Sequence, residues 1–155
     1  GLLTNNKNQI RVIMYKVTEE QLGYIEYYLK MFKEYVDQFN LAEKEFLGSL
    51  LGYCISEFKE WKTEFFYLVQ DIEQNFLTQK KSIYEDNTNP SISEENLKQL
   101  HNIGLTIDEV ITDIETIIRY NIIDITSEAV IGKVIYRIDK SIDILSTLLK
   151  NISNS

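Results

Sequence analysis

Apolar residues recur at alternating steps of four and three between Leu47 and Ile72. The positions are Leu47, Leu51, Cys54, Phe58, Trp61, Phe65, Leu68 and Ile72. This spacing is typical of a helix that packs against near-parallel neighbours, as in coiled coils. A second apolar set lies beside it, so the helix must be covered on more than one face. The pattern predicts a long helix of about Leu41 to Ile83 at the centre of a bundle.

The preceding segment shows the same periodicity. Its apolar positions are Leu22, Ile25, Leu29, Phe32, Val36 and Phe39. They predict a helix over 19–39, which starts at the capping-box pattern of Thr18 unless it runs unbroken from about Asn6. Because the apolar registers on the two sides of Asn40 disagree, we expect the chain to reverse there. Asn40, with Glu43 three residues later, is the expected N-cap of the next helix.

The clearest loop of the chain covers residues 85–91 and carries its only proline. Ser91 and Glu94 form a second capping-box pattern. The apolar spacing that follows predicts a third helix of about Ser93 to Tyr120, in spite of Gly104 inside it.

A fourth helix is expected to follow, with Asp124 or Thr126 as its cap. Its apolar positions are Ile131, Ile135, Ile138, Ile142, Leu145 and Leu149. Short connections join antiparallel neighbours. The sequence therefore predicts an all-α fold, an antiparallel up-down four-helix bundle with a long central second helix. We expect a single domain over 1–155, with frayed polar ends at 1–8 and 151–155.

The net charge of −8 restricts the possible partners. It argues against nucleic acid, which needs clustered Lys and Arg, and against an anionic membrane surface. No apolar run approaches the roughly 20 residues of a membrane span, so this segment should not insert into a membrane. An acidic surface suits solubility or a basic protein partner. The chain starts with Gly1 rather than Met, so the expectation of a cytoplasmic protein leaves an extracytoplasmic one open.

Catalytic and metal-binding patterns are nearly absent from the sequence. Cys54 is the sole cysteine and lies on the apolar seam, where a small buried side chain is expected. His101 is the sole histidine, which excludes sites that need two imidazoles. Glu109 and Asp113 lie one helical turn apart, as do Asp139 and Asp143, and two such pairs from neighbouring helices could bind a hard cation. All four positions lie between the apolar seams, where solvated charges belong. We predict no catalytic residue, no cofactor and no metal site.

The aromatic residues gather in the first two helices, whereas isoleucine dominates the last two. Phe and Trp suit a core. Tyr24, Tyr27 and Tyr28 span too wide an arc of the helix for all three to be buried, and tyrosine is enriched at protein interfaces. Both a core role and an interface role therefore stay open for the tyrosines.

Helix lengths indicate where an interface would lie. At ~1.5 Å per residue, the second helix spans roughly 60 Å and the third about 40 Å, so the third should reach only to about Glu57. The first two helices would then project as an arm with an exposed apolar patch. The predicted partner-binding residues are Tyr24, Tyr28, Tyr35, Phe39, Phe46, Leu50 and Tyr53. A shifted third helix, or residues 1–17 folded back, would instead cover them.

The sequence thus favours a non-catalytic helical bundle that binds another protein, as an inhibitor, an immunity-type protein or a scaffold. A basic protein or a second copy of the chain is the expected partner. The alternative is an extracytoplasmic sensor domain that binds a small ligand between its helices. An enzyme ranks third.

Overall fold

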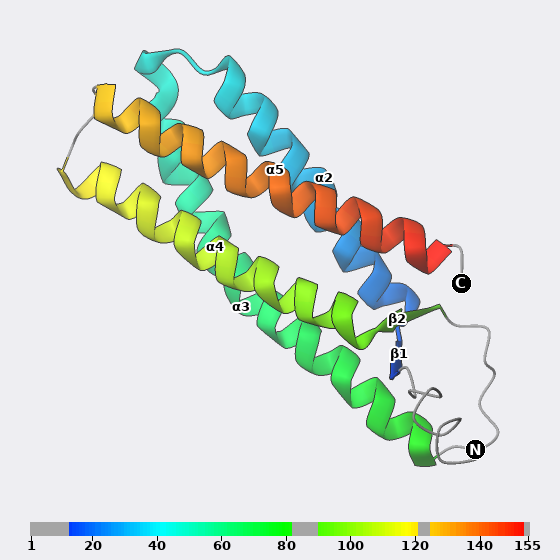
Figure 1. Cartoon of the computed structure of the whole chain (residues 1–155). Coiled ribbons are helices and arrows are strands. Elements are labelled where there is room, and N and C mark those ends of the chain that lie inside the picture. Colours follow the sequence, from blue (N-terminus) through cyan, green and yellow to red (C-terminus); the bar gives the residue numbers. More distant parts are fainter. Residues whose placement is uncertain (1–12, 82–89, 121–124, 154–155) are drawn as a thin grey trace, which may run out of the picture.

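A computed structural model describes residues 13–81, 90–120 and 125–153. Within these residues four helices pack against one another, which confirms the predicted all-helical class (Figure 1). The helices are α2 (Glu19–Leu41), α3 (Lys44–Lys81), α4 (Glu94–Tyr120) and α5 (Ile125–Ser153), and two short strands are β1 (Met14–Lys16) and β2 (Ser91–Ser93). None of the described helices has both the length and the apolar character that a membrane crossing requires.

The corner between α2 and α3, the end of α4 and the start of α5 lie at one end of the molecule, and the two strands lie at the other (Figure 1). Helix α4 packs mainly on α3 and also on α5, and α5 packs on α2 as well. The contact between α2 and α3 is the lightest of the four. Among these neighbouring pairs, the backbones of α2 and α3 therefore approach each other least closely.

Thr18 is the N-cap of α2, as its capping-box pattern predicts. The Gln21 amide donates to Thr18 Oγ1 at 3.1 Å, and the Thr18 amide donates to Gln21 Oε1 at 3.0 Å. The alternative of an unbroken helix from about Asn6 is wrong, because the residues directly before Thr18 form β1. The expected frayed end at 1–8 lies outside the described residues.

Strand β1 pairs antiparallel with β2, with Tyr15 opposite Ile92. The Val17 amide extends the pairing by donating to the Pro90 carbonyl at 2.8 Å. Val17 and Ile92 are both buried in the core. This small ribbon joins the start of α2 to the start of α4, a contact that the sequence analysis did not predict.

The predicted N-cap at Asn40 is wrong. Asn40 lies inside α2, and Ala42 is the extended residue that ends the helix. Glu43 lies directly before the start of α3, and its carbonyl accepts from the Phe46 amide at 3.0 Å. Helix α2 thus ends two residues after the predicted end at residue 39.

The predicted caps of the last two helices also need correction. Ser93, not Ser91, caps α4, since its Oγ accepts from the Asn96 amide at 3.1 Å and Ser91 belongs to β2. Thr126 lies inside α5, while Asp124 lies outside the described residues. The expected frayed tail is wrong up to Ser153, because α5 continues to that residue.

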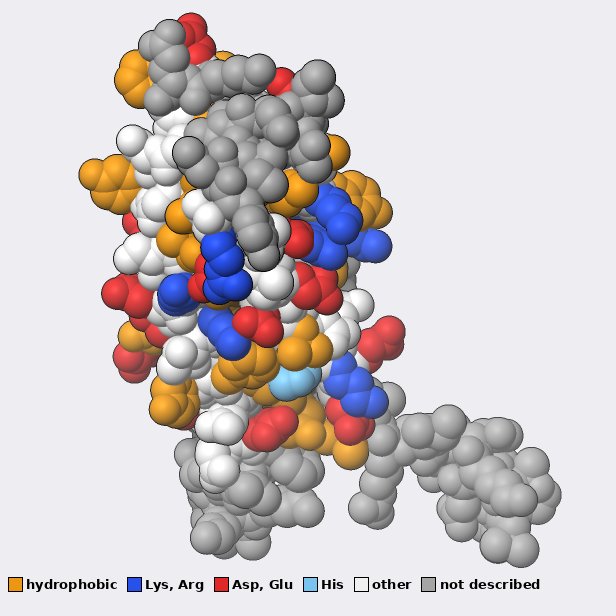
Figure 2. Space-filling model, turned by 90° about the vertical axis from the view of Figure 1, so that its left-hand side faces the viewer, with side chains coloured by type: hydrophobic (Ala, Val, Ile, Leu, Met, Phe, Trp, Pro, Cys, Tyr) orange, Lys and Arg blue, Asp and Glu red, His pale blue; other side chains and the backbone are white. Residues whose placement is uncertain are grey.

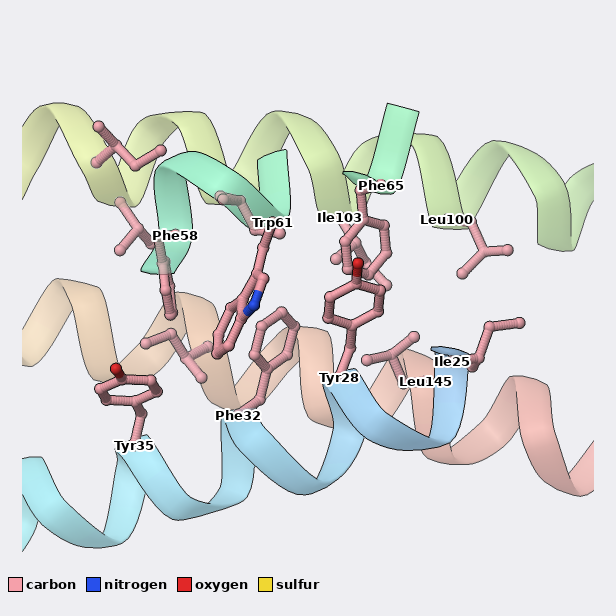
Figure 3. Close-up of a cluster of buried hydrophobic side chains, with 14 of the residues drawn as sticks. Ile25, Tyr28, Phe32, Tyr35, Phe58, Trp61, Phe65, Leu100, Ile103 and Leu145 are labelled. Carbon is pink, nitrogen blue, oxygen red and sulfur yellow. The ribbon is translucent and has the colours of Figure 1, made fainter. Parts of the chain in front are cut away.

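The predicted seam of α3 is confirmed in full, since all eight of its residues are buried. Figure 3 shows Tyr28, Phe32 and Tyr35 of α2 pointing toward the α3 side of the core. There they meet Phe58, Trp61 and Phe65, with ring centroids 4.4 Å apart for Tyr28 and Phe65 and 5.8 Å apart for Phe32 and Trp61. The buried positions of α4 and α5 are almost all aliphatic.

Candidate binding groove

The predicted projecting arm is wrong for three of its seven residues. Tyr28, at 1% exposed, and the similarly buried Tyr35 and Phe39 are core residues. The helix-length argument overlooked α5, which begins beside the α2–α3 corner. There Ile131 of α5 lines a cavity of about 240 Å³ together with Phe39 and Leu47.

The other four predicted residues lie at two separate places. Phe46 and Tyr53 are 63% and 71% exposed on α3, and Leu50 between them is half-buried. Phe46 and Tyr53 are two helical turns apart and therefore share a face near the corner. Tyr24, 48% exposed, lies in the first half of α2 and does not join them.

Tyr24 instead lines a groove of about 430 Å³ between the N-terminal half of α2 and α3. The groove combines three phenol rings with three carboxylates. Its lining residues are Thr18, Glu20, Gln21, Tyr24, Tyr28, Glu64, Tyr67, Leu68 and Asp71. It lies along the seam between α2 and α3, the neighbouring helix pair whose backbones approach each other least closely.

A hydrogen bond across the seam holds the inner wall of the groove. The Tyr28 hydroxyl donates to Glu64 Oε2 at 2.5 Å. Burial raises the pKa of Tyr28 well above its ordinary range, and the bond to Glu64 raises it further. The phenol therefore stays a donor at neutral pH and keeps the Glu64 carboxylate in place.

A second polar cluster closes one end of the groove. Asn75 Nδ2 donates to Gln21 Oε1 at 2.6 Å and to the Lys16 carbonyl at 2.9 Å. Gln21 is also the capping-box residue of α2, so one side chain joins the helix start to α3. These contacts give the end of the groove a defined shape.

The exposed part of the groove has the chemistry of a cation-binding surface. Tyr67 is 62% exposed, and the carboxylates of Glu20 and Asp71 are exposed as well. None of the nine lining residues is Lys or Arg. Phenol faces and carboxylates both attract cationic groups, so the groove suits a positively charged ligand.

The carboxylates of Glu109 and Asp113, considered above as cation ligands, lie against a basic side chain of the same protein. Arg137 of α5 forms ion pairs with Glu109, at 3.3 Å from Nε, and with Asp113. Lys59 and Lys62 of α3 similarly pair with Glu115 and Asp108 of α4. On the face in Figure 2, basic and acidic side chains accordingly lie next to one another. In the described part of the chain no three His, Cys, Asp or Glu side chains are grouped so as to hold a metal.

Cys54 is buried on the seam of α3, as predicted. Burial raises the pKa of its thiol well above the ordinary value, and the nearby charge of Glu57 adds to the effect. A thiol that stays protonated is a poor nucleophile and a poor metal ligand at neutral pH. Cys54 is a packing residue in this structure.

Of the nine groove residues the sequence analysis predicted only Tyr24 and Tyr28 as binding residues, and the seven that it missed include Glu20, Glu64, Tyr67 and Asp71. A signal for the last three exists. On α3 the residues Glu64, Tyr67 and Asp71 follow at steps of three and four, directly beside the apolar seam. Such a stripe marks one helix face as surely as an apolar stripe does. It was overlooked because charged positions beside a seam are usually solvated.

Comparison with protein-family models, curated proteins and solved structures gives no match.

Proposed function

We propose that this protein is a non-catalytic helical bundle that acts by binding another protein through the outer face of α2 and α3. An inhibitor, an immunity-type protein and a scaffold all work in this way. The groove between the two helices carries the proposal, because it presents rings and carboxylates together on an otherwise mixed surface. Aromatic side chains with polar tips give large contact area at protein interfaces.

The exposed tyrosines of the same face extend this surface. Tyr24 and Tyr67 line the groove, and Tyr27, 46% exposed, lies beside it with its ring 5.6 Å from Tyr28. Exposed aromatic side chains gathered on one face favour a partner over solvent as the neighbour. Phe46 and Tyr53 form a smaller patch near the corner, which we assign to the edge of the same interface or to self-association.

The finer architecture belongs to this proposal. We infer an antiparallel up-down bundle in which the long α3 is the scaffold on which the binding face is built. The connection of two residues between α2 and α3 supports the reversal of direction at that corner. The length of α3, 38 residues, favours its role as the helix along which the binding face is built.

Site-specific photocrosslinking tests the proposal. A benzophenone amino acid is placed at Tyr67 and, as a matched control, at Tyr136 of α5, which is 63% exposed. After irradiation in a lysate of the source cells, one protein should be crosslinked at position 67 and not at position 136. That protein is then purified, and its affinity for the parent should exceed its affinity for Tyr67→Leu. Equal crosslinking at both positions, or unchanged affinity, would contradict the proposal.

A second candidate is a sensor domain that binds a small ligand in the same groove. The volume of about 430 Å³ supports it, because small-molecule sites have roughly 300–1,000 Å³. Native mass spectrometry of the protein purified from its source distinguishes the two. A retained small molecule that is lost in Tyr67→Leu would favour the sensor, and a retained polypeptide would favour the protein-binding role.

A further inference from the structure

We propose that the groove between α2 and α3 takes an arginine side chain of the partner protein. This inference rests on the proposed function and names the group that the groove recognises. The groove holds the carboxylates of Glu20, Glu64 and Asp71, and no Lys or Arg is among its lining residues to neutralise them. The other charge clusters described above are different, since their carboxylates are paired with Lys59, Lys62 or Arg137.

The two walls place rings and carboxylates within reach of one ligand. On α3, Tyr67 lies between Glu64 and Asp71, which are two helical turns or roughly 10 Å apart along the axis. Tyr24 on α2 belongs to the opposite wall. A cation that lies against the Tyr67 ring therefore has a carboxylate on either side of it.

The inner wall is ordered before any ligand arrives. Glu64 is held through Oε2 by the buried Tyr28 hydroxyl, and the Gln21–Asn75 bond closes one end. A ligand therefore does not need to order these groups, which lowers the entropic cost of binding. The exposed Tyr67 and Asp71 supply the contacts at the open side.

Arginine fits this arrangement better than lysine does. A guanidinium group is planar and weakly hydrated, so it can stack on a phenol ring while its edge donates to carboxylates. An ammonium group is compact and strongly hydrated, and it cannot make the stacked and the in-plane contact together. The net charge of −8 attracts a basic partner to this face in addition.

Peptide titration followed by nuclear magnetic resonance tests the inference directly. Three N-acetylated and C-amidated Gly-Xaa-Gly-Xaa-Gly peptides carry arginine, lysine or citrulline at Xaa, and amide shifts of the isotope-labelled protein report binding. The arginine peptide should shift amides around Gln21, Tyr67 and Asp71. Its affinity should exceed that of the lysine peptide by at least about fivefold, or roughly 1 kcal/mol, because only the guanidinium combines the stacked contact with in-plane hydrogen bonds. The neutral citrulline peptide should not bind.

Matched variants separate the groove from general surface charge. Asp71→Asn and Tyr67→Leu should each weaken the arginine peptide severalfold. Asp37→Asn removes an exposed carboxylate from α2 outside the groove, and Tyr136→Leu removes an equally exposed ring from α5, so neither should matter. Circular dichroism checks that each variant is folded. If Tyr67→Leu is unfolded, the inference is tested by comparing the affinity of Asp71→Asn for the arginine peptide with that of Asp37→Asn.

Several results would overturn the inference. They are equal binding of the arginine and lysine peptides, equal weakening by the control variants, or no amide shifts at the groove. The failure of the proposed function is a separate outcome. A partner crosslinked at Tyr67 without any arginine preference keeps the protein-binding role and rejects the arginine site. Specific arginine binding without a crosslinked partner keeps the arginine site and rejects that role.

Discussion

The core between α2 and α3 consists of rings, whereas the core between α4 and α5 consists of branched aliphatic side chains. On the first side the Phe32 ring is tilted against Trp61, at 5.8 Å between centroids, and stacked nearly parallel to Phe65, at 6.3 Å. On the second side the buried residues are almost all isoleucine, leucine and valine. Rings span a wide gap between helices, and short aliphatic chains interlock across a narrow one.

The polar contacts at the surface of the two halves also differ. Arg137 joins α5 to two carboxylates of α4 and so covers the outside of the aliphatic half. Across the aromatic half, Tyr28 contacts Glu64 from inside the core, and a groove remains outside this bond. The comparison teaches that large core side chains can hold two helices apart and still leave a shaped surface. We place the proposed binding surface on the aromatic half for this reason.

Removing the indole of Trp61 should have the largest effect on the aromatic half. Trp61 is buried and contacts the rings of Tyr28, Phe32, Tyr35 and Phe58. Trp61→Ala should lower the free energy of unfolding by roughly 3–5 kcal/mol, because the cavity it leaves cannot collapse fully. Urea unfolding followed by circular dichroism measures the change.

Two further variants frame this result. Leu148→Ala, in the aliphatic half, should lower the free energy of unfolding by about 2–5 kcal/mol, because Leu148 is fully buried. Tyr53→Ala, at a largely exposed position of the same helix as Trp61, should stay within about 0.5 kcal/mol of the parent. If Trp61→Ala unfolds at the same urea concentration as Tyr53→Ala, the rings do not hold α2 and α3 together.

Alkaline pH should weaken the aromatic half selectively. Burial raises the pKa of Tyr28 and of Tyr35 above the ordinary value of 10.0, with Glu64 and Glu57 adding to the effect. The folded protein keeps both phenols protonated at a pH at which the unfolded chain has lost the protons. Stability is therefore fully present below pH 10.0 and falls above it, by up to about 1.4 kcal/mol per pH unit and buried phenol.

The pH dependence of urea unfolding between about pH 9 and about pH 12 measures this effect. Tyr28→Phe should flatten the slope, although it also removes the bond to Glu64 and so lowers stability at every pH. Equal slopes for the parent and Tyr28→Phe would show that the Tyr28 phenol titrates as freely in the folded protein as in the unfolded chain.

The sequence predicted the α3 seam in full, because burial there follows hydrophobicity. In α5 only three of the six predicted seam positions are buried, since Ile135, Ile142 and Leu149 are half-buried. In α2 the prediction failed at Tyr28 and Tyr35. Leu22 and Leu29 were expected in the core of α2, but they are only half-buried, while the two tyrosines are buried. A tyrosine can be buried when its hydroxyl finds a partner, and the Glu64 partner of Tyr28 lies on another helix. Periodicity within one helix cannot show such a partner.

The β1–β2 ribbon and the groove were beyond the pattern for related reasons. Three-residue strands are too short to show an alternation, so Met14 and Val17 fitted a helical spacing equally well. The groove needs Tyr24 of α2 and Tyr67 of α3 side by side, which depends on how far apart the two helices lie. The sequence showed an excess of tyrosine near the right place, but not which tyrosines face outward.

The smallest expected effect tests the place where the two halves meet, at Gly104 of α4. A Cβ added there would lie 3.2 Å from Cε1 and 3.3 Å from Cζ of Phe66 on α3. The Phe66 ring also packs edge-on against His101, at 5.3 Å between centroids, so a shift of a few tenths of an ångström would disturb that contact. Glycine inside a helix ordinarily costs about 1 kcal/mol relative to alanine.

Gly132→Ala in α5, where nothing lies within 4 Å of the added atom, should gain about that amount. Gly104→Ala should gain less than about 0.5 kcal/mol or lose stability, since the contact with Phe66 offsets the gain. Thermal unfolding of the two variants side by side decides, and equal gains would mean that α3 and α4 are not in tight contact at this glycine.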